Sequence, residues 1–351
     1  MANNDSSASG SDKPRDSAIQ PAEQGKSEYV QVDLRSFVAG RPPLVDIYYH
    51  VAGQYVLYCE AGADFTDTAR LRLLSNGITD PYIRFTNGHV GAGNLNLPDL
   101  LAIPDSRLPP LIKAGLLYSS TLAIARNLYT SPVLPENLAA AQQLVGSIVV
   151  SLTRQPETYV ALVQMMRHDF AIYTHAVNVC TYAAGLGGLL GFKGDALVNL
   201  AYAGFLLDVG KTKVPRAILD KLTPLTKEEW TIVQHHPEWG AQLLRDAVRN
   251  RPGVLEIVLQ HHERLDGSGY PRGLKGAEIY PPARIVAVAD AYDALTAGRP
   301  YQSPLAPYEA LMTIREETEQ ADHFDREVFV AFVKLLSTDR RGDTSDLTAP
   351  Q

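Results

Sequence analysis

The sequence predicts an α+β protein in which a small strand-rich module precedes a larger all-helical domain. Short runs rich in valine, isoleucine, tyrosine and phenylalanine lie between residues 28 and 105, separated by glycine, asparagine and proline, which is typical of strands and turns. From about residue 106 onward, apolar residues recur at three- and four-residue spacing, which is typical of helices. The chain has 351 residues and 45% hydrophobic content, enough for one large or two ordinary domains.

The two ends of the chain, residues 1–27 and 338–351, contain few large apolar side chains. Such segments cannot bury enough apolar surface to offset the entropy lost on ordering. We therefore expect both of them to be disordered tails.

The module at residues 28–105 holds the predicted strands, in the runs "LVDIYYHV", "QYVLYCEA" and "PYIRFTN". Between the last two runs, Thr66 or Asp67 is suited to cap a short helix that Asn76 and Gly77 end. The sequence therefore predicts a small α+β domain.

Residues 106–155 are expected to form connecting helices that pack on the helical domain at 156–337. The first long helix of that domain is predicted from Phe170 to Leu190, with Asp169 as its N-cap and Gly191 just beyond its end.

Further helix starts follow from capping residues. Asp195 is expected to cap a helix from Ala196 to Val209. Thr226 and Glu229 have the spacing of a capping box, and Pro281 suits the first turn of another helix. The second half of the chain is thus predicted to be a series of helices.

Bulk properties exclude several classes of protein. The net charge of −7 argues against a non-specific nucleic-acid binder, which is usually basic. The two cysteines, Cys59 and Cys180, do not make a disulfide framework and suit a reducing compartment. No signal peptide and no apolar run of about 18 residues stands out, so we expect a soluble, cytoplasmic protein without a membrane span.

The helical half contains a set of imidazoles and carboxylates that together suit divalent transition metals such as Fe, Mn, Zn or Ni. Each falls within or at the end of a predicted helix, and helices can direct ligands into the core of a bundle. A binuclear phosphohydrolase needs six or seven such ligands, and the chain offers His175, Asp208, His236, His261, His262 and Asp290. We assign the remaining histidines of this half, His168 and His323 among them, structural or surface roles.

The order of these residues resembles the HD-GYP family, a branch of the HD-domain metal-dependent phosphohydrolases. The blocks that carry the resemblance lie between about residues 165 and 335: "YTHAVNV", "LLDVGK", "HHPEWGAQLL", "HHERLDGSGYPRGLKG" and "ARIVAVADAYDALTAGRPYQ". The resemblance implies an all-helical domain that hydrolyses the bacterial messenger cyclic di-GMP. It also implies a regulatory or sensory role for residues 28–105, with signalling partners such as GGDEF-type proteins.

The resemblance further implies two metal positions, occupied by Fe or Mn. The first position comprises His175, Asp208, Asp290 and the histidine of the HD pair, which in this chain is Leu207. The second comprises Asp208 as a bridge together with three imidazoles, those of His236, His261 and His262. A third metal, which some members hold, is not expected because its glutamate is replaced by Ala171.

Four other residues receive roles from the same resemblance. Lys211 is expected to place positive charge near a phosphate or leaving oxygen, beside the catalytic Asp208. Arg299 is expected to hold a phosphate bidentately, and Asp293 to orient a ligand or Arg299. Tyr270 is expected to line the substrate pocket.

Three hypotheses for the function remain open at this point. The first is a phosphodiesterase that converts cyclic di-GMP to linear pGpG or GMP, with activity impaired by Leu207. The second is a catalytically degenerate module that binds cyclic di-GMP or partner proteins, which Leu207 and Gln302 favour. The third is an HD-type hydrolase of another phosphoester, which the "GYP" block disfavours.

Overall fold

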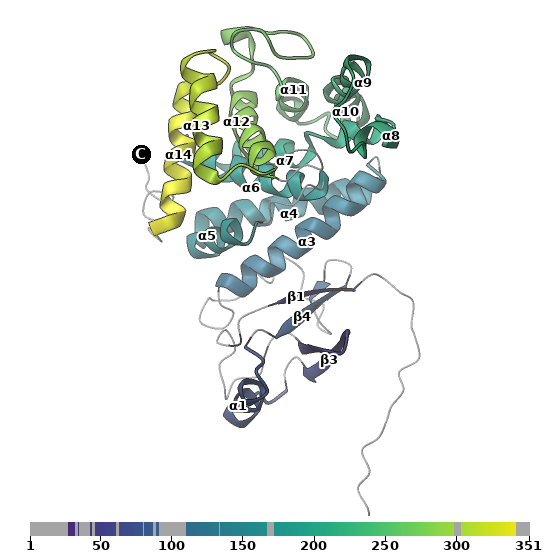
Figure 1. The fold of residues 1–351 in the computed structure, drawn as a ribbon, viewed down its shortest axis with the longest axis vertical. Helices are drawn as coiled ribbons and strands as arrows, with labels where there is room; N and C mark the ends of the chain where they lie inside the picture. Colours follow the sequence, from purple (N-terminus) through teal and green to yellow (C-terminus); the bar gives the residue numbers. More distant parts are fainter. Residues whose placement is uncertain are drawn as a thin grey trace, which may run out of the picture.

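The structure, a computed structural model, describes residues 27–31, 34, 43, 46–60, 63–79, 81–86, 89–90, 110–132, 134–166, 172–297 and 303–341. It confirms the predicted fold class, a small strand-rich domain followed by an all-helical domain (Figure 1).

The N-terminal domain is an antiparallel sheet packed against a short helix. The strand order is β1-β4-β2-β3, with β5 paired to β4. Helix α1, Asp67–Ser75, lies between β3 and β4 in sequence, and the predicted cap Thr66 accepts a hydrogen bond from the amide of Ala69. The strands are β1 Ser27–Gln31, β2 Ile47–Val51, β3 Gln54–Cys59, β4 Tyr82–Thr86 and β5 His89–Val90.

Most of the described helices of the rest of the chain contribute to one apolar core. Proline opens many of them, because its fixed φ suits the first helical turn and its missing N–H is not needed there. Their bounds are α3 Pro110–Thr130, α4 Pro135–Arg154, α5 Pro156–Met165, α6 Ile172–Leu189, α7 Gly194–Leu206, η2 Val209–Lys213, α8 Arg216–Leu219, α9 Lys227–Val233, α10 His236–Leu244, α11 Pro252–Gln260, η3 Gly276–Glu278, α12 Pro281–Thr296, α13 Pro307–Glu319 and α14 Arg326–Arg341.

Several predicted helix boundaries agree with these bounds. Gly191 follows α6 with a φ of +86°, a conformation that glycine adopts without steric penalty. The capping box at α9 is present in full, with Thr226 and Glu229 each accepting the other's backbone N–H. The predicted cap Asp169 lies outside the described residues.

Other boundaries were wrong. Helix α7 starts at Gly194 with Lys193 as its N-cap, so Asp195 lies inside the first turn, where its charge favours the helix dipole instead of capping. The same helix ends at Leu206, and residues up to Val209 do not continue it. Helix α14 includes residues 338–341, which the sequence had placed in a disordered tail.

The long helix α3 lies between the sheet and the other helices, where it crosses the underside of the helical domain (Figure 1). It contacts β1 on one side and α4, α5, α6 and η2 on the other. Helix α6 is buried on nearly all sides, in keeping with its almost continuous run of apolar and small residues. A central, fully buried helix gives the side chains at its ends a rigid support.

A close approach between η2 and α10 depends on Gly210. A Cβ atom at this position would collide with the backbone carbonyl oxygen of His236 and lie 2.5 Å from the amide nitrogen of Gly240. Only glycine therefore lets the turn after α7 rest directly on the start of α10. This contact brings Asp208 and His236, which precede and begin these two elements, to the same place.

The substitution Gly210→Ala is predicted to destabilise the protein by about 3 kcal/mol, since the backbone must shift to admit the methyl group. Thermal unfolding followed by circular dichroism measures the effect as a lower Tm. Gly146→Ala is the matched control: it lies inside α4 with open space around its Cβ position, so it should stabilise by about 0.5–1 kcal/mol. Equal Tm changes in the two variants would contradict the packing argument.

Candidate metal centre

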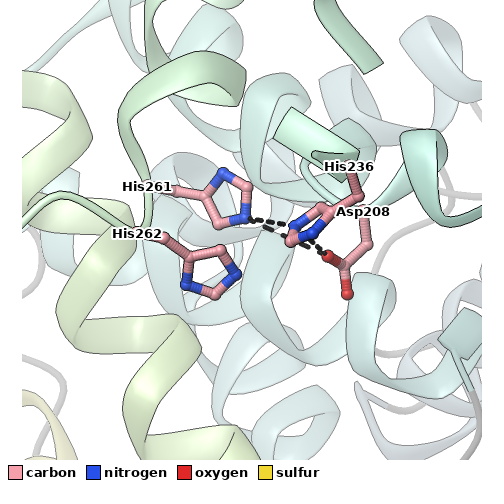
Figure 2. Close-up of side chains that lie close together, drawn as sticks. All are labelled: Asp208, His236, His261 and His262. Carbon is pink, nitrogen blue, oxygen red and sulfur yellow. Dashed lines mark hydrogen bonds and ion pairs between the residues drawn. The ribbon is translucent and has the colours of Figure 1, made fainter. Parts of the chain in front are cut away.

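Four of the predicted ligands converge at the meeting point of three helix ends (Figure 2). Asp208 follows α7, His236 begins α10, and His261 and His262 directly follow α11. Each offers one ligand atom, and these atoms all lie within 4.8 Å of one another. The structure therefore brings together every residue assigned to the second metal position.

Backbone carbonyl groups fix the orientation of two imidazole rings of the cluster. The Nδ1–H of His236 donates to the carbonyl oxygen of Val233 and that of His261 to the carbonyl oxygen of Val258, each at 2.8 Å. Because a carbonyl oxygen can only accept, Nδ1 carries the proton of each neutral ring and Nε2 presents a lone pair. The two Nε2 atoms nevertheless face each other at 3.2 Å.

Asp208 completes this electron-rich centre. Its Oδ1 lies 3.2 Å from Nε2 of His236 and 4.0 Å from Nε2 of His261. The same oxygen is buried and has no hydrogen-bond partner among the described residues. Facing lone pairs around an unsatisfied buried carboxylate oxygen repel one another unless a cation lies between them, so the residues present fit a divalent metal.

The protonation states suit this role. Burial acts to raise the pKa of Asp208, but the charge of Lys211 opposes it, and the pKa of this carboxyl lies well below its usual value. Burial lowers the pKa of His261 to about 4 and holds that of His262 well below its usual value. At neutral pH these side chains are therefore in the forms that bind metals.

A second group of side chains adjoins the cluster on the Oδ2 side of Asp208. Nε2 of His175 lies 2.9 Å from Oδ1 of Asp290 and 3.6 Å from Oδ2 of Asp208. Its Nδ1–H donates to Oδ2 of Asp293 at 2.7 Å, and the amide of Asn178 donates to the other oxygen of Asp293. Asp293 thus holds the ring of His175, whose own role as a metal ligand stays a prediction.

The carboxylates around His175 also change its charge. Burial by itself lowers the pKa of this imidazole, but the hydrogen bonds and charges of Asp290 and Asp293 outweigh burial and raise the pKa to about 10. The ring therefore carries a proton on both nitrogens and acts as a cation among the carboxylates.

Leu207 stands at the sequence position where the resemblance puts the remaining ligand, and Lys211 contacts the shared carboxylate. Leu207 directly follows α7, has an exposed fraction of 0% and belongs to the apolar core. The ammonium of Lys211 lies 2.6 Å from Oδ2 of Asp208. The first position thus retains His175, Asp208 and Asp290, and a lysine already neutralises the shared carboxylate.

The side chains at the cluster differ in their exposure to solvent, and we call the place of the more exposed ones the open side. The side chains of Asp208, His236 and His261 are almost fully buried, whereas His175, His262 and Lys211 have exposed fractions of 15%, 17% and 24%. The ring of Tyr270 stacks on His262 with centroids 4.6 Å apart, at this open side. Tyr270 thus lies beside a candidate metal ligand, and its role in lining a substrate pocket stays a prediction.

The loop that carries Tyr270 is held by Glu263, which sequence reasoning did not single out. Both oxygens of this buried carboxylate accept backbone N–H groups, from Arg272 at 2.8 Å and from Leu274 at 3.0 Å. Gly269 lies so close to the backbone at His262 and Arg264 that a Cβ atom would collide with it. The only sequence signal for Glu263 is its place directly after the histidine pair.

Some predicted residues cannot be placed. Arg299 and Gln302 lie outside the described residues, as does Ala171. His323, which was assigned a structural role, lies 3.7 Å from Asp266 and 3.5 Å from Glu317.

Comparisons with known proteins show what the helical part of the chain is similar to. Residues 160–328 match the family model described as an HD domain. Over 198 residues, the chain is 39% identical to a cyclic di-GMP phosphodiesterase of Pseudomonas aeruginosa, covering 56% of this chain and 47% of that protein. It is 36% identical over 162 residues to a 3'3'-cGAMP-specific phosphodiesterase of Vibrio cholerae, covering 46% of this chain and 37% of that protein. The chain therefore spans about half or less of the length of these relatives.

A solved structure supports the fold. An HDG"Y"P protein from Bdellovibrio bacteriovorus superposes with a TM-score of 0.59 at 19% identity, covering 88% of this chain and all of that one. These matches confirm the resemblance inferred from the sequence. None of the helices that the structure describes is long and apolar enough to cross a lipid bilayer.

The substitution Glu263→Gln is predicted to destabilise the protein by about 1–3 kcal/mol, since the new amide NH2 group cannot accept from a backbone N–H. Hydrogen exchange at Arg272 and Leu274 should accelerate. Glu278→Gln is the matched control: this exposed carboxylate accepts from Lys275 in the same loop, where water can substitute. Unchanged exchange in Glu263→Gln would show that the carboxylate does not hold the loop.

Proposed function

We propose, from the premise that residues 160–328 belong to the HD-domain family in its HD-GYP form, that this chain is a metal-dependent phosphodiesterase of cyclic di-GMP. The observation that carries the proposal is the cluster of Asp208, His236, His261 and His262, with its facing lone pairs and unsatisfied carboxylate oxygen. Such a donor set suits Fe or Mn. The products are pGpG or GMP.

Under this proposal, the residues of the candidate site have separate roles. A divalent metal held by the cluster supplies Lewis acidity for a phosphodiester. Lys211, partly exposed beside Asp208, places positive charge where the phosphate or leaving oxygen carries negative charge. Asp293 holds His175 in one orientation, and Tyr270 borders the open side. Arg299 is proposed to bind a second phosphate oxygen.

The two metal positions differ in strength under this proposal. The second position has its full complement of protein ligands. At the first, Leu207 offers no donor, both nitrogens of His175 already contact carboxylates, and Lys211 already contacts Asp208. We therefore propose one tightly held metal and one weak position.

Residues 28–105 are proposed to regulate the site. The support is α3, which contacts strand β1 and also η2, the short helix that follows Asp208 and contains Lys211. A change at the sheet therefore has a direct structural route to the residues beside the metal cluster.

A second candidate function is a cyclic di-GMP receptor without turnover. The observation that favours it is again Leu207, which places a fully buried apolar side chain next to the shared carboxylate. Both candidate functions include binding of cyclic di-GMP, but only the phosphodiesterase would hydrolyse it.

Metal content is predicted to be one Fe or Mn per purified wild-type chain, measured by elemental analysis after anaerobic preparation. Leu207→His should raise it towards two, because an imidazole adds the ligand that the first position lacks. Leu207→Asn is the control, equally polar but a poor ligand for these metals, and should stay at one. Two tightly held metals in the wild type would contradict the proposed difference between the positions.

Hydrolysis of cyclic di-GMP is predicted for the anaerobically prepared protein supplied in turn with Fe, Mn, Zn and Ni, with Leu207→His turning over faster than the wild type. Asp208→Asn should abolish activity, because both metal positions share this carboxylate. Turnover by Leu207→His alone would favour the receptor. No turnover by either protein with any metal would overturn the phosphodiesterase proposal.

A further inference from the structure

We propose that Trp230 is the platform on which a nucleobase of the cyclic dinucleotide stacks, a specificity-determining role that rests on the proposed function. Trp230 lies in α9, and its ring meets that of Tyr270 edge to face, with centroids 6.2 Å apart. Tyr270 in turn stacks on His262, a member of the candidate metal cluster. The three rings therefore form a continuous aromatic row that begins at the metal ligands.

The row leads outward from the cluster to solvent. His236 and His261 at its inner end are fully buried, His262 is partly exposed, and Trp230 has an exposed fraction of 45%. A phosphate bound at the open side projects its nucleoside away from the buried ligands. The exposed part of Trp230 lies beyond Tyr270 in that outward direction, where a nucleobase needs a stacking partner.

The position of Trp230 is fixed before any ligand binds. Glu229 beside it closes the capping box of α9 and also receives a hydrogen bond from Lys221, which holds the start of this helix. The end of the same helix leads through Gln234 and His235 into α10, which begins with the ligand His236. Because the helix is anchored at its start and the ring already contacts Tyr270, stacking on Trp230 orders little further backbone.

Stacking gives affinity without strong choice between bases, since every nucleobase has a π-face. Tryptophan offers the largest aromatic surface of the side chains, so its loss should weaken binding of a dinucleotide about tenfold or more. The same loss should leave the metal cluster intact, because Trp230 contacts it only through Tyr270. The effect should therefore appear in the KM and in the Kd, with kcat nearly unchanged.

The experiment uses the full, metal-loaded chain and a bisphosphorothioate analogue of cyclic di-GMP, which resists hydrolysis. The chain has 2 tryptophans, so Trp239→Phe leaves Trp230 as the sole fluorescent reporter. We expect saturable quenching of Trp230 by the analogue and by GMP, and none by ribose 5-phosphate, which lacks a base. Trp239→Phe should keep the wild-type Kd in calorimetry.

Trp230→Ala should raise the Kd of the analogue about tenfold, whereas Trp230→Phe should recover most of the affinity because it restores a stacking ring. Thermal unfolding and metal content confirm that both variants remain folded and loaded. Wild-type binding with less than a twofold change in Trp230→Ala would overturn the stacking role and leave the phosphodiesterase proposal standing. Absence of wild-type binding would overturn both.

Discussion

The buried Oδ1 atom of Asp208 is the point on which the arrangement of the helical domain depends. It lies against two imidazole nitrogens that present lone pairs, and no described group donates a hydrogen bond to it. An ionised oxygen in such surroundings is unfavourable by several kcal/mol unless a cation compensates it. Three helix ends nonetheless converge there. The convergence requires glycine at position 210, because a Cβ atom there would collide with the backbone of α10.

The two oxygens of Asp208 face different environments. Oδ1 faces the Nε2 atoms of His236 and His261, while Oδ2 faces the ammonium of Lys211 and the imidazolium of His175. One side of the carboxylate is therefore suited to a metal, and the other is already compensated by protein cations. Leu207 adds no donor to either side, because its apolar side chain is buried in the core at the sequence position where the resemblance implies a further imidazole.

The rim of the site depends on interactions of a different kind. The buried carboxylate of Glu263 accepts hydrogen bonds from backbone amides of a loop that has no regular secondary structure. In this loop, Tyr270 stacks on His262. Helix α9 presents Trp230 to Tyr270 from the other side. Tyr270 and Trp230 lie beside the metal cluster but supply none of its ligand atoms. Under the proposed function, a change at these rings can therefore alter affinity for the substrate without altering affinity for the metal.

The sequence by itself determined the fold class, the capping box at Thr226 and the set of residues that gather at Asp208. The cap is local, because it forms between residues three positions apart, whereas the ligands lie far apart in the chain and were recognised from sequence blocks that resemble a known family. Tertiary structure alone decided that Lys193 and not Asp195 caps α7, that Asn178 supports Asp293, and that Trp230 reaches Tyr270. The last two contacts join residues far apart in the chain, and their geometry arises from helix packing, which no local pattern encodes.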